Sequence, residues 1–324
     1  MNHPRFLVLV LIGLASACGK VDDNIRNVEL RDEMRAFVID LSTYAKAQNN
    51  NFIVIPQNGI ELVSSNGDTD GSPKLSYLNA IDGNGQEDLF YGYNNDNQLT
   101  PTVESQYLVD LLSISQGTNK AILVMDYCST PSNMDNTYAK CMSQGYISFA
   151  ADERDLNNIP NYPSTIRGEN SNNITSLAAI ENFLYLINPE NFNSRAGLIN
   201  AISATNYDLV ILDLFFNDNT TFLPSEIDAL KVKSNGGTRL VIAYMSIGEA
   251  EDYRYYWDKS WYKNAPEWLD DENSDWAGNF KVKYWNEDWQ SIIFGNNDSY
   301  LKKIIDANFD GVYLDIIEAY EYYE

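Results

Sequence analysis

Carboxylates and amides recur at the ends of short apolar runs along this chain of 324 residues. Nine runs end on such side chains: Asn58, Glu87 with Asp88, Asp126, Asp152, Asn188, Asp213, Glu249, Asn286 and Asp315. Carboxyl groups can transfer protons and attack electrophilic carbon, and amides can hold a polar ligand by hydrogen bonds. The residue types therefore predict a site in which acids do the chemistry.

The composition excludes several other kinds of catalytic site. The only histidine is His3, which lies in a predicted leader, so the remaining chain has no Ser-His-Asp or Cys-His nucleophile. Without a histidine, Cys128 and Cys141 cannot complete a zinc site, and we expect neither a metal nor a cofactor. These two cysteines either form a disulfide, as an oxidising compartment would permit, or remain two buried thiols.

The alternation of short apolar runs with helix-length segments predicts the elements that position these acids. Such alternation is typical of an α/β fold with βα units around a parallel sheet, and the length fits one (β/α)8 TIM barrel of about 250 residues or more. A TIM barrel carries its active site at the carboxyl ends of its strands. We therefore expect the strand-end acids to line one cup.

The first residues have the features of a targeting segment. Arg5 precedes an apolar run that is too short to span a membrane. Residues 14–18, Leu-Ala-Ser-Ala-Cys, resemble the bacterial lipobox, and an ordinary signal peptide is the alternative. We predict a lipoprotein signal peptide over 1–17, a tether over 18–27 and lipidation of Cys18. The lipobox implies a bacterial outer-membrane lipoprotein that faces the periplasm or the cell surface.

The charge of the chain limits its partners. There are 46 acidic and 22 basic residues, which give a formal net charge of −24 at pH 7. Such a charge repels nucleic acid and anionic membrane surfaces, and it attracts polycations. We expect no nucleic-acid partner, membrane contact only through the lipid anchor, and a monomer. Solubility explains most of the charge, and a cationic substrate is a further interpretation.

Two features indicate an unusual order of the elements. Residues 157–178 are polar and rich in turn formers, which predicts a linker inside a single domain over 28–324. Apolar residues at helical spacing predict a helix near the amino end: Leu30, Met34, Phe37, Val38 and Leu41. This helix has no strand before it, and the GVYLDI strand at 311–316 has no helix after it. We predict a circularly permuted barrel that is cut after this strand.

Long motifs in both halves resemble glycoside hydrolase family 114, the endo-α-1,4-polygalactosaminidase family. Residues 207–323 carry YDLVILDL, YMSIGEAEDYRYYW, PEWL, VKYWNEDWQ and NFDGVYLDIIEAYEYY, which resemble the first half of the family. Residues 28–156 carry FIVIPQNGIEL, YLNAIDGNGQEDLFYGY, KAILVMDY and GYISFAADERDL, which resemble its second half. The halves stand in the opposite order to that of the family, in keeping with a permutation.

This resemblance implies a TIM barrel that cleaves α-1,4-linked galactosamine or N-acetylgalactosamine polysaccharide with retention of configuration. Asp315 matches the family's nucleophile and Glu87 its acid/base, with Asp88, Glu249 and Asp213 as rivals of Glu87. In a retaining enzyme the two carboxyl groups lie about 5–5.5 Å apart. The polysaccharide would be the partner, and it is cationic where its amino groups are free. The alternative function is a non-catalytic cell-surface lipoprotein that binds glycan.

Other residues near strand ends are candidates for substrate binding: Asp213, Glu249, Asp126, Tyr127 and Asn58. The alternative for Asp213 and Glu249 is a structural salt bridge with Arg254. All six tryptophans fall within residues 257–289. Trp285, which we expect at a strand end, is the favoured platform for stacking on a sugar ring.

Overall fold

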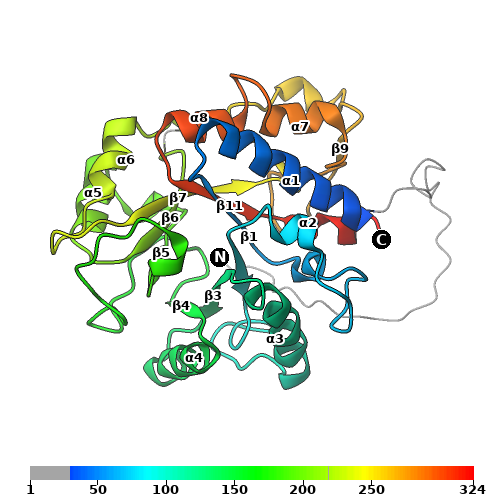
Figure 1. Cartoon of the computed structure of the whole chain (residues 1–324). Helices are drawn as coiled ribbons and strands as arrows, with labels where there is room; N and C mark the ends of the chain where they lie inside the picture. The colour runs from blue at the N-terminus through cyan, green and yellow to red at the C-terminus, as the bar shows by residue number, and fades with distance from the viewer. Residues whose placement is uncertain (1–29, 218) are drawn as a thin grey trace.

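The computed structural model describes residues 30–217 and 219–324. Strands lie in the middle of the molecule, and helices surround them (Figure 1). The parallel strands in the described residues are β1 (Ile53–Pro56), β2 (Gly83–Glu87), β3 (Ala121–Tyr127), β4 (Ile147–Ala151), β5 (Phe183–Tyr185), β6 (Leu209–Asp213), β7 (Leu240–Ser246) and β11 (Gly311–Asp315). Each lies in a predicted apolar run, which confirms an α/β fold with parallel sheets.

These strands form two sheets that contact each other along both edges. One sheet has the order β1-β11-β7-β6-β5 and the other β2-β3-β4. Where β1 meets β2, Gln57 and Gly85 form a parallel bridge, and the Asn58 N–H donates to the Gly85 carbonyl over 2.9 Å. Where β4 meets β5, the ring centroids of Phe149 and Phe183 lie 5.7 Å apart. Because the bridge between the sheets is also parallel, the carboxyl ends of both sheets lie on one side.

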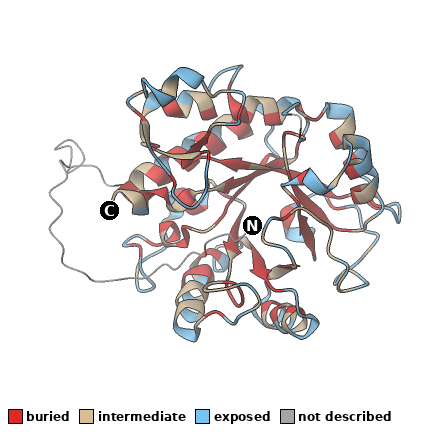
Figure 2. Cartoon of the chain, turned by 180° about the vertical axis from the view of Figure 1, so that it is seen from behind, coloured by how far each residue is buried: buried red, intermediate tan, exposed pale blue. Residues whose placement is uncertain are grey.

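The helices place their apolar faces against the sheets. The helices in the described residues are α1 (Leu30–Gln48), α2 (Leu75–Leu78), α3 (Thr102–Gln116), α4 (Pro131–Gln144), α5 (Arg195–Ser203), α6 (Pro224–Leu230), α7 (Glu287–Ile293) and α8 (Tyr300–Asp306). Figure 2 shows buried residues along the strands and exposed residues on the outer sides of the helices. The core therefore lies around the strands, as the amphipathic pattern of the longer helices requires.

Helix α1 confirms the helix that was predicted from apolar spacing near the amino end. Its predicted core residues are all buried: Leu30, Met34, Phe37, Val38 and Leu41. The start of α1 lies against the carboxyl-terminal segment, because Arg31 Nε donates to Glu324 Oε1 over 2.8 Å and the Tyr284 hydroxyl donates to the Leu30 carbonyl over 2.8 Å. The helix then leads into β1, and its start lies against the segment that follows β11, the parallel neighbour of β1.

A small antiparallel sheet accompanies the parallel ones. It has the order β8 (Glu249–Glu251), β10 (Asn279–Val282) and β9 (Leu269–Glu272). The expectation that the VKYWN run forms a further strand of the parallel sheet, ending on Asn286, is wrong, since β10 ends at Val282 and pairs antiparallel with both neighbours. Trp285 therefore lies in the turn before α7 rather than at a strand end.

The segment 157–178 forms no α-helix and no strand longer than a single bridge. It is nevertheless anchored, because the Asn170 side chain donates to Asp208 Oδ2 over 2.9 Å and its Oδ1 accepts from Lys233 Nζ over 3.1 Å. Lys233 and Asp208 also form an ion pair of 2.6 Å whose side chains are fully buried. These contacts fix the segment beneath the amino end of β6.

Two sequence predictions concern the surroundings of the fold. The predicted signal peptide, the tether and the lipidation site at Cys18 lie outside the described residues. Within 30–217 and 219–324, none of the helices combines the length and the apolar character that crossing a membrane needs. Cys128 and Cys141 are both buried with free thiols, which answers the open choice between a disulfide and two thiols.

Candidate active site

Two strand-end carboxylates meet on one amide nitrogen. Gln57, directly after β1, donates from Nε2 to Glu87 Oε2 over 2.7 Å and to Asp315 Oδ1 over 2.9 Å. Glu87 ends β2 and Asp315 ends β11, so three strands converge at this point. The structure thus brings together the two residues predicted as the catalytic pair, which are 228 positions apart in the sequence.

Neighbouring residues fix the orientation of this bridging amide and of Glu87. The Tyr185 hydroxyl donates to Gln57 Oε1 over 3.0 Å, which leaves the Gln57 amide nitrogen for the two carboxylates. Asn58 donates from Nδ2 to Glu87 Oε2 over 3.0 Å and accepts the Glu87 backbone N–H on Oδ1. Asn58 has a φ of 58°, a left-handed conformation that Asn tolerates better than most residues. Asn58 therefore contacts Glu87, and its predicted role in substrate binding stays a prediction.

Tyrosine hydroxyls occupy the remaining oxygens of the pair. Tyr127 donates to Glu87 Oε1 over 2.6 Å, and Tyr244 donates to Asp315 Oδ2 over 2.7 Å. Burial, together with the negative charge of the acceptor, raises the pKa of both phenols well above the usual value, so they act as hydrogen-bond donors. Among the described residues, every side chain that donates to the pair is uncharged, so the negative charge of the pair is met by dipoles rather than by a cation.

This environment favours the protonated form of Asp315. Burial raises the pKa of Asp315 to about 7, and the negative charge of Glu87 adds to the effect. Hydrogen bonds from Tyr244 and from the Ile316 N–H act in the opposite direction but do not cancel it. Two acids that share one small space cannot both ionise freely, so near neutral pH the site can hold one proton beside one carboxylate.

The separation of the two acids suits glycoside chemistry. Laid end to end, the two hydrogen bonds of Gln57 Nε2 span about 5.6 Å, which is the upper limit for the distance between the two oxygens that they join. Retaining glycosidases place their carboxyl groups about 5–5.5 Å apart, and inverting ones about 6.5–9.5 Å apart. The arrangement is therefore compatible with attack by one carboxylate and protonation by the other.

Aromatic residues form the floor beneath the pair. The rings of Tyr185 and Tyr313 meet edge to face with centroids 5.2 Å apart, and both residues are buried. A Cβ at Gly85 would collide with the Tyr313 hydroxyl, so β2 needs glycine here to admit this ring below Glu87. Gly85 of the GNGQE strand thus makes room for the floor of the site.

Asp213, predicted as a binding residue and a rival acid, is engaged by a cation instead. Arg254 donates from Nη1 and Nη2 to the two Asp213 oxygens over 2.9 and 2.7 Å, and from Nε to Glu251 Oε2 over 2.6 Å. All three side chains are largely buried. The structure therefore places Asp213 in the salt bridge with Arg254 that was the alternative to a binding role.

Glu249, the other predicted partner of Arg254, bonds to neutral groups. It is fully buried, and it accepts from Asn273 Nδ2 and the Tyr322 hydroxyl over 2.8 Å each and from Asn279 Nδ2 over 3.2 Å. Its negative charge helps to raise the pKa of Asp315, which indicates that it lies close to the pair. Glu249 thus lies beside the site, held by Asn279 of β10, by Asn273 directly after β9 and by Tyr322 near the chain end.

Asp126 and Tyr127 take opposite faces of β3. Tyr127 reaches Glu87, whereas Asp126 is buried behind the strand and accepts the N–H groups of Phe90 and Tyr91 and the hydroxyl of Thr137. Successive residues of a strand point to opposite sides, so the two could not share the substrate-binding role that was predicted for both. Asp126 instead supports the loop after β2.

Arg154 reinforces the position of Tyr127 from the solvent side. Its guanidinium carbon lies 3.7 Å from the centroid of the Tyr127 ring, and Nη2 donates to Asp88 Oδ1 over 3.1 Å. Arg154 Nε also donates to Asp96 over 2.7 Å. Burial raises the pKa of Asp88 to about 7, although the charge of Arg154 opposes this. Asp88, a predicted rival of Glu87, therefore faces Arg154 rather than Asp315.

Trp285 lies among aromatic residues near the chain end. Its ring meets the ring of Tyr323 with centroids 4.9 Å apart and that of Tyr284 at 5.0 Å. No hydrogen bond or ring contact in the described residues joins it to Gln57, and its role as a sugar platform stays a prediction.

Three residues that the sequence analysis did not select lie closer to the carboxylate pair than Trp285 does. They are Gln57, Tyr185 and Tyr244.

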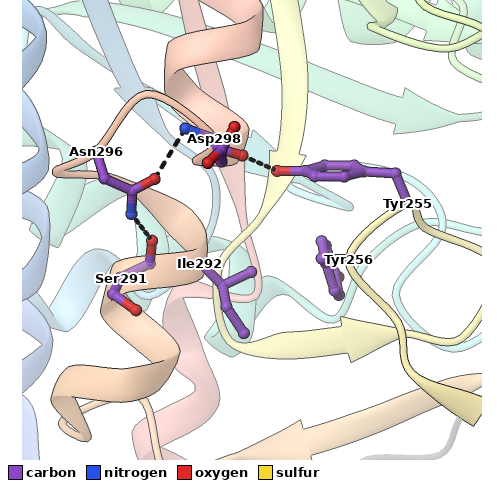
Figure 3. Close-up of a pocket in the computed structure, with 6 residues that line it drawn as sticks. All are labelled: Tyr255, Tyr256, Ser291, Ile292, Asn296 and Asp298. Carbon is purple, nitrogen blue, oxygen red and sulfur yellow. Dashed lines mark hydrogen bonds between the residues drawn. The ribbon is translucent and has the colours of Figure 1, made fainter.

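A separate cavity lies away from the carboxylate pair. It has a volume of about 300 Å³ and is bounded by Tyr255, Tyr256, Ser291, Ile292, Asn296 and Asp298 (Figure 3). The Tyr255 hydroxyl donates to the Asp298 carbonyl over 2.9 Å across it.

No group of three or more His, Cys, Asp or Glu side chains in the described ranges is arranged to hold a metal ion.

Comparison with known proteins relates the second half of the chain to a described family. Residues 191–323 match the model of glycoside-hydrolase family GH114. The chain is 41% identical over 157 residues to an uncharacterized protein of Methanocaldococcus jannaschii, which covers 48% of this chain and 42% of the relative. Uncharacterized proteins of Thermotoga maritima and Deinococcus radiodurans are 40% and 42% identical over 122 and 123 residues, or 36% and 37% of their lengths. The chain thus spans about two fifths of these curated relatives.

Proposed function

We propose that this chain hydrolyses glycosidic bonds with Asp315 and Glu87 as its two carboxyl groups, because residues 191–323 match the model of glycoside-hydrolase family GH114. The observation that carries the proposal is the amide nitrogen of Gln57, which hydrogen-bonds both carboxylates at once. Asp315 lies in the matched region, and Glu87 reaches it from outside that region. The site therefore depends on both halves of the chain.

The proposed reaction is a double displacement. Asp315 attacks the anomeric carbon while Glu87 gives its proton to the leaving glycosidic oxygen, which breaks the bond and leaves a glycosyl ester on Asp315. The Glu87 carboxylate then takes a proton from water, and the resulting hydroxide attacks the anomeric carbon and releases Asp315. Gln57, Tyr127 and Tyr244 keep their hydrogen bonds to the two acids and so hold them in place.

The raised pKa of Asp315 bears on which acid takes which role. In the free protein it favours a proton on Asp315, whereas the resemblance assigns the proton to Glu87. Azide can distinguish the two assignments of nucleophile and acid/base. In a variant that lacks one carboxylate, azide can attack the anomeric carbon in place of the missing group. With an activated α-glycoside, we expect Glu87→Gly to form the α-glycosyl azide and Asp315→Gly to form the β-anomer. The reverse pattern would exchange the two roles.

We propose a polymer of α-1,4-linked galactosamine, in part N-acetylated, as the substrate. The formal net charge of −24 and the neutral donors around the pair support a substrate that carries ammonium groups, because such groups would reduce the repulsion between the two acids. A surface lipoprotein is a suitable setting for such an activity, and this placement rests on residues 14–18 alone.

We also propose that the two sheets close into one permuted (β/α)8 barrel. The bridge between Gln57 and Gly85 and the ring contact of Phe149 with Phe183 support closure at the two edges. The position of α1 supports the permutation, because it supplies a helix between β11 and its parallel neighbour β1. In such a permuted barrel, residues 157–178 connect the positions at which the amino and carboxyl ends lie in the family's usual order.

The experiment that tests the function uses purified residues 19–324 and partly deacetylated α-1,4-galactosaminan. We expect soluble fragments from the wild type and a loss of at least about 10³-fold in kcat for Glu87→Gln and Asp315→Asn. Asp40→Asn on the exposed side of α1 is the matched control and should retain full activity. Binding of the polymer without any cleavage by the wild type would instead support the glycan-binding alternative.

A further inference from the structure

The cavity of Figure 3 is open to solvent beside the loop that follows β8. Its volume of about 300 Å³ is at the lower end of the range for pockets that take small ligands, about 300–1,000 Å³. Tyr255 is 41% exposed, and the other polar residues at its edge, Ser291, Asn296 and Asp298, are exposed as well. A ligand can therefore enter this cavity from the surface.

Two tyrosines and one isoleucine form the apolar part of the cavity. The rings of Tyr255 and Tyr256 meet edge to face with centroids 5.5 Å apart, and Ile292 lies on the same side of Tyr255 as Tyr256 does (Figure 3). The Tyr255 ring also contacts Phe215 and Tyr300, with centroid distances of 5.9 and 6.1 Å. The fold therefore holds an exposed aromatic ring in place, and such a ring suits the apolar C–H face of a sugar.

The polar groups of the cavity have mainly acceptor atoms left for a ligand. The Tyr255 hydroxyl donates its proton to the Asp298 backbone carbonyl over 2.9 Å. The Ser291 hydroxyl donates its proton to the Asp288 carbonyl over 2.8 Å. Each hydroxyl has one proton, so both can only accept from a ligand. Within the described ranges, the Asp298 carboxylate accepts no hydrogen bond and forms no ion pair, and only its backbone is bonded.

The electrostatics of the cavity favour a positive ligand. The Asp298 carboxylate acts on the Tyr255 hydroxyl, since burial and the charge of Asp298 raise the pKa of Tyr255. Lys303 Nζ lies 4.7 Å from the centroid of the Tyr255 ring, which shows that this ring attracts an ammonium group. Lys303 is not among the residues that bound the cavity, and it forms no ion pair with Asp298. Unused acceptors beside an unpaired carboxylate suit hydroxyl and ammonium groups and disfavour an anion.

The cavity adjoins the ion pairs of Arg254 rather than the catalytic pair. The Tyr256 hydroxyl accepts the Glu251 N–H over 3.0 Å, and Phe215, which contacts Tyr255, lies two residues after the end of β6. Among the described residues, no side chain that bounds the cavity hydrogen-bonds to Glu87 or Asp315. A ligand in the cavity therefore leaves both catalytic carboxylates free for another part of the same polymer.

We propose that this cavity is a second glycan-binding site, which takes one amino-sugar residue with its ammonium group on the Asp298 carboxylate and its ring against Tyr255. The choice of a sugar rests on the proposed function, whereas the preference for hydroxyl groups and a positive charge rests on the cavity itself. The site holds the polymer away from the bond that is cut, and it takes no part in bond breaking.

The first test follows single sugars by NMR on residues 19–324 with labelled isoleucine methyl groups. The Ile292 methyl reports on the cavity, and the Ile316 methyl, beside Asp315, reports on the catalytic pair. With galactosamine we expect a saturable shift of the Ile292 signal and a Kd in the millimolar range. Galactose has no ammonium group and should bind there at least about threefold more weakly. An Ile292 signal that does not move up to about 100 mM galactosamine would overturn the proposal.

Two variants test the contacts in the same titration. Asp298→Asn keeps the shape but loses the charge, so galactosamine should bind about threefold more weakly and galactose equally well. Tyr255→Ala removes the ring, so the binding of both sugars should weaken about fivefold. Asp288→Asn, an exposed residue of α7 outside the cavity lining, is the matched control for a lost charge and should bind as the wild type does. Galactosamine binding by Asp298→Asn as tight as by the wild type would overturn the proposal.

Activity separates this inference from the proposed function. We expect Asp298→Asn to raise KM for the polymer about threefold with kcat unchanged, and to leave kcat/KM for a short activated α-glycoside unchanged. An Ile292 response in a protein that cleaves no glycan would refute the function and retain the second site. Cleavage of the polymer without an Ile292 response would refute the second site and retain the function.

Discussion

Two clusters of acids lie at neighbouring strand ends and are neutralised in different ways. Around β1, β2 and β11, Glu87 and Asp315 are held by amide and hydroxyl donors alone. Around β6 and β8, Asp213 and Glu251 share the guanidinium of Arg254. In the first cluster Asp315 can gain or lose a proton near neutral pH, whereas the acids of the second cluster are paired with a cation that does not deprotonate.

This difference indicates which acids are available for chemistry. A buried carboxylate with a bidentate Arg partner is stabilised in its ionised form and has both oxygens occupied by a cation. A carboxylate that is bonded to neutral donors stays sensitive to its neighbours and to a ligand. Strand-end position alone therefore does not select the catalytic acids, and the partners of each acid do.

The largest expected effect comes from removing the cation of the second cluster. Arg254→Met should lower the free energy of unfolding by about 3–5 kcal/mol, because it leaves Asp213 and Glu251 buried without a counter-ion. Urea denaturation at pH 7 measures this change. The triple variant Arg254→Met, Asp213→Asn, Glu251→Gln should recover part of it, and a loss below about 1 kcal/mol in the single variant would contradict the comparison.

Removing the neutral donor of the first cluster should affect activity more than folding. Gln57→Leu has a similar volume but loses the amide that both carboxylates share, so we expect kcat/KM to fall about 10–100-fold. Gln290→Leu on α7, which loses a bond from its amide to the Tyr284 carbonyl, is the matched control for a lost glutamine. Equal activity of both variants would show that the bridge is dispensable.

The smallest expected effect is a pH dependence of stability. The pKa of Asp315 is about 7 in the folded protein and near 3.9 in an unfolded chain, so the unfolded chain ionises first as pH rises. Ionisation therefore weakens folding between about pH 4 and pH 7, and the penalty is complete above pH 7. Asp315→Asn removes this penalty, so the free energy of unfolding of the variant, compared with that of the wild type at the same pH, should be higher at pH 8 than at pH 4.

Asp213→Asn provides the opposite case for the same measurement. It removes the partner of Arg254, so at pH 8 it should lower the free energy of unfolding rather than raise it. Denaturation of both variants at pH 4 and pH 8 would give the sign of each effect. If both variants changed the free energy of unfolding in the same direction at pH 8, the distinction between the two clusters would be contradicted.

The sequence predicted the strands well but the partners of the acids poorly. Apolar runs locate all eight parallel strands, because burial on both faces leaves a strong local signal. The VKYWN run was placed wrongly, since an apolar run does not tell a parallel strand from a hairpin of an inserted sheet. Gln57 was missed because its importance arises only where β1, β2 and β11 converge. Strand alternation could have separated Tyr127 from Asp126, as each residue points to its own side.

Arg154 links the site to the protein surface, because it contacts both the Tyr127 ring and the exposed Asp96. It is partly open to solvent, pairs with the exposed Asp96 and covers the ring whose hydroxyl bonds to Glu87. Dissolved salt screens exposed ion pairs, so added ions would loosen the contact that holds this ring. Turnover should then respond to ionic strength even on an uncharged glycan, through a cation that bonds to neither carboxylate of the pair.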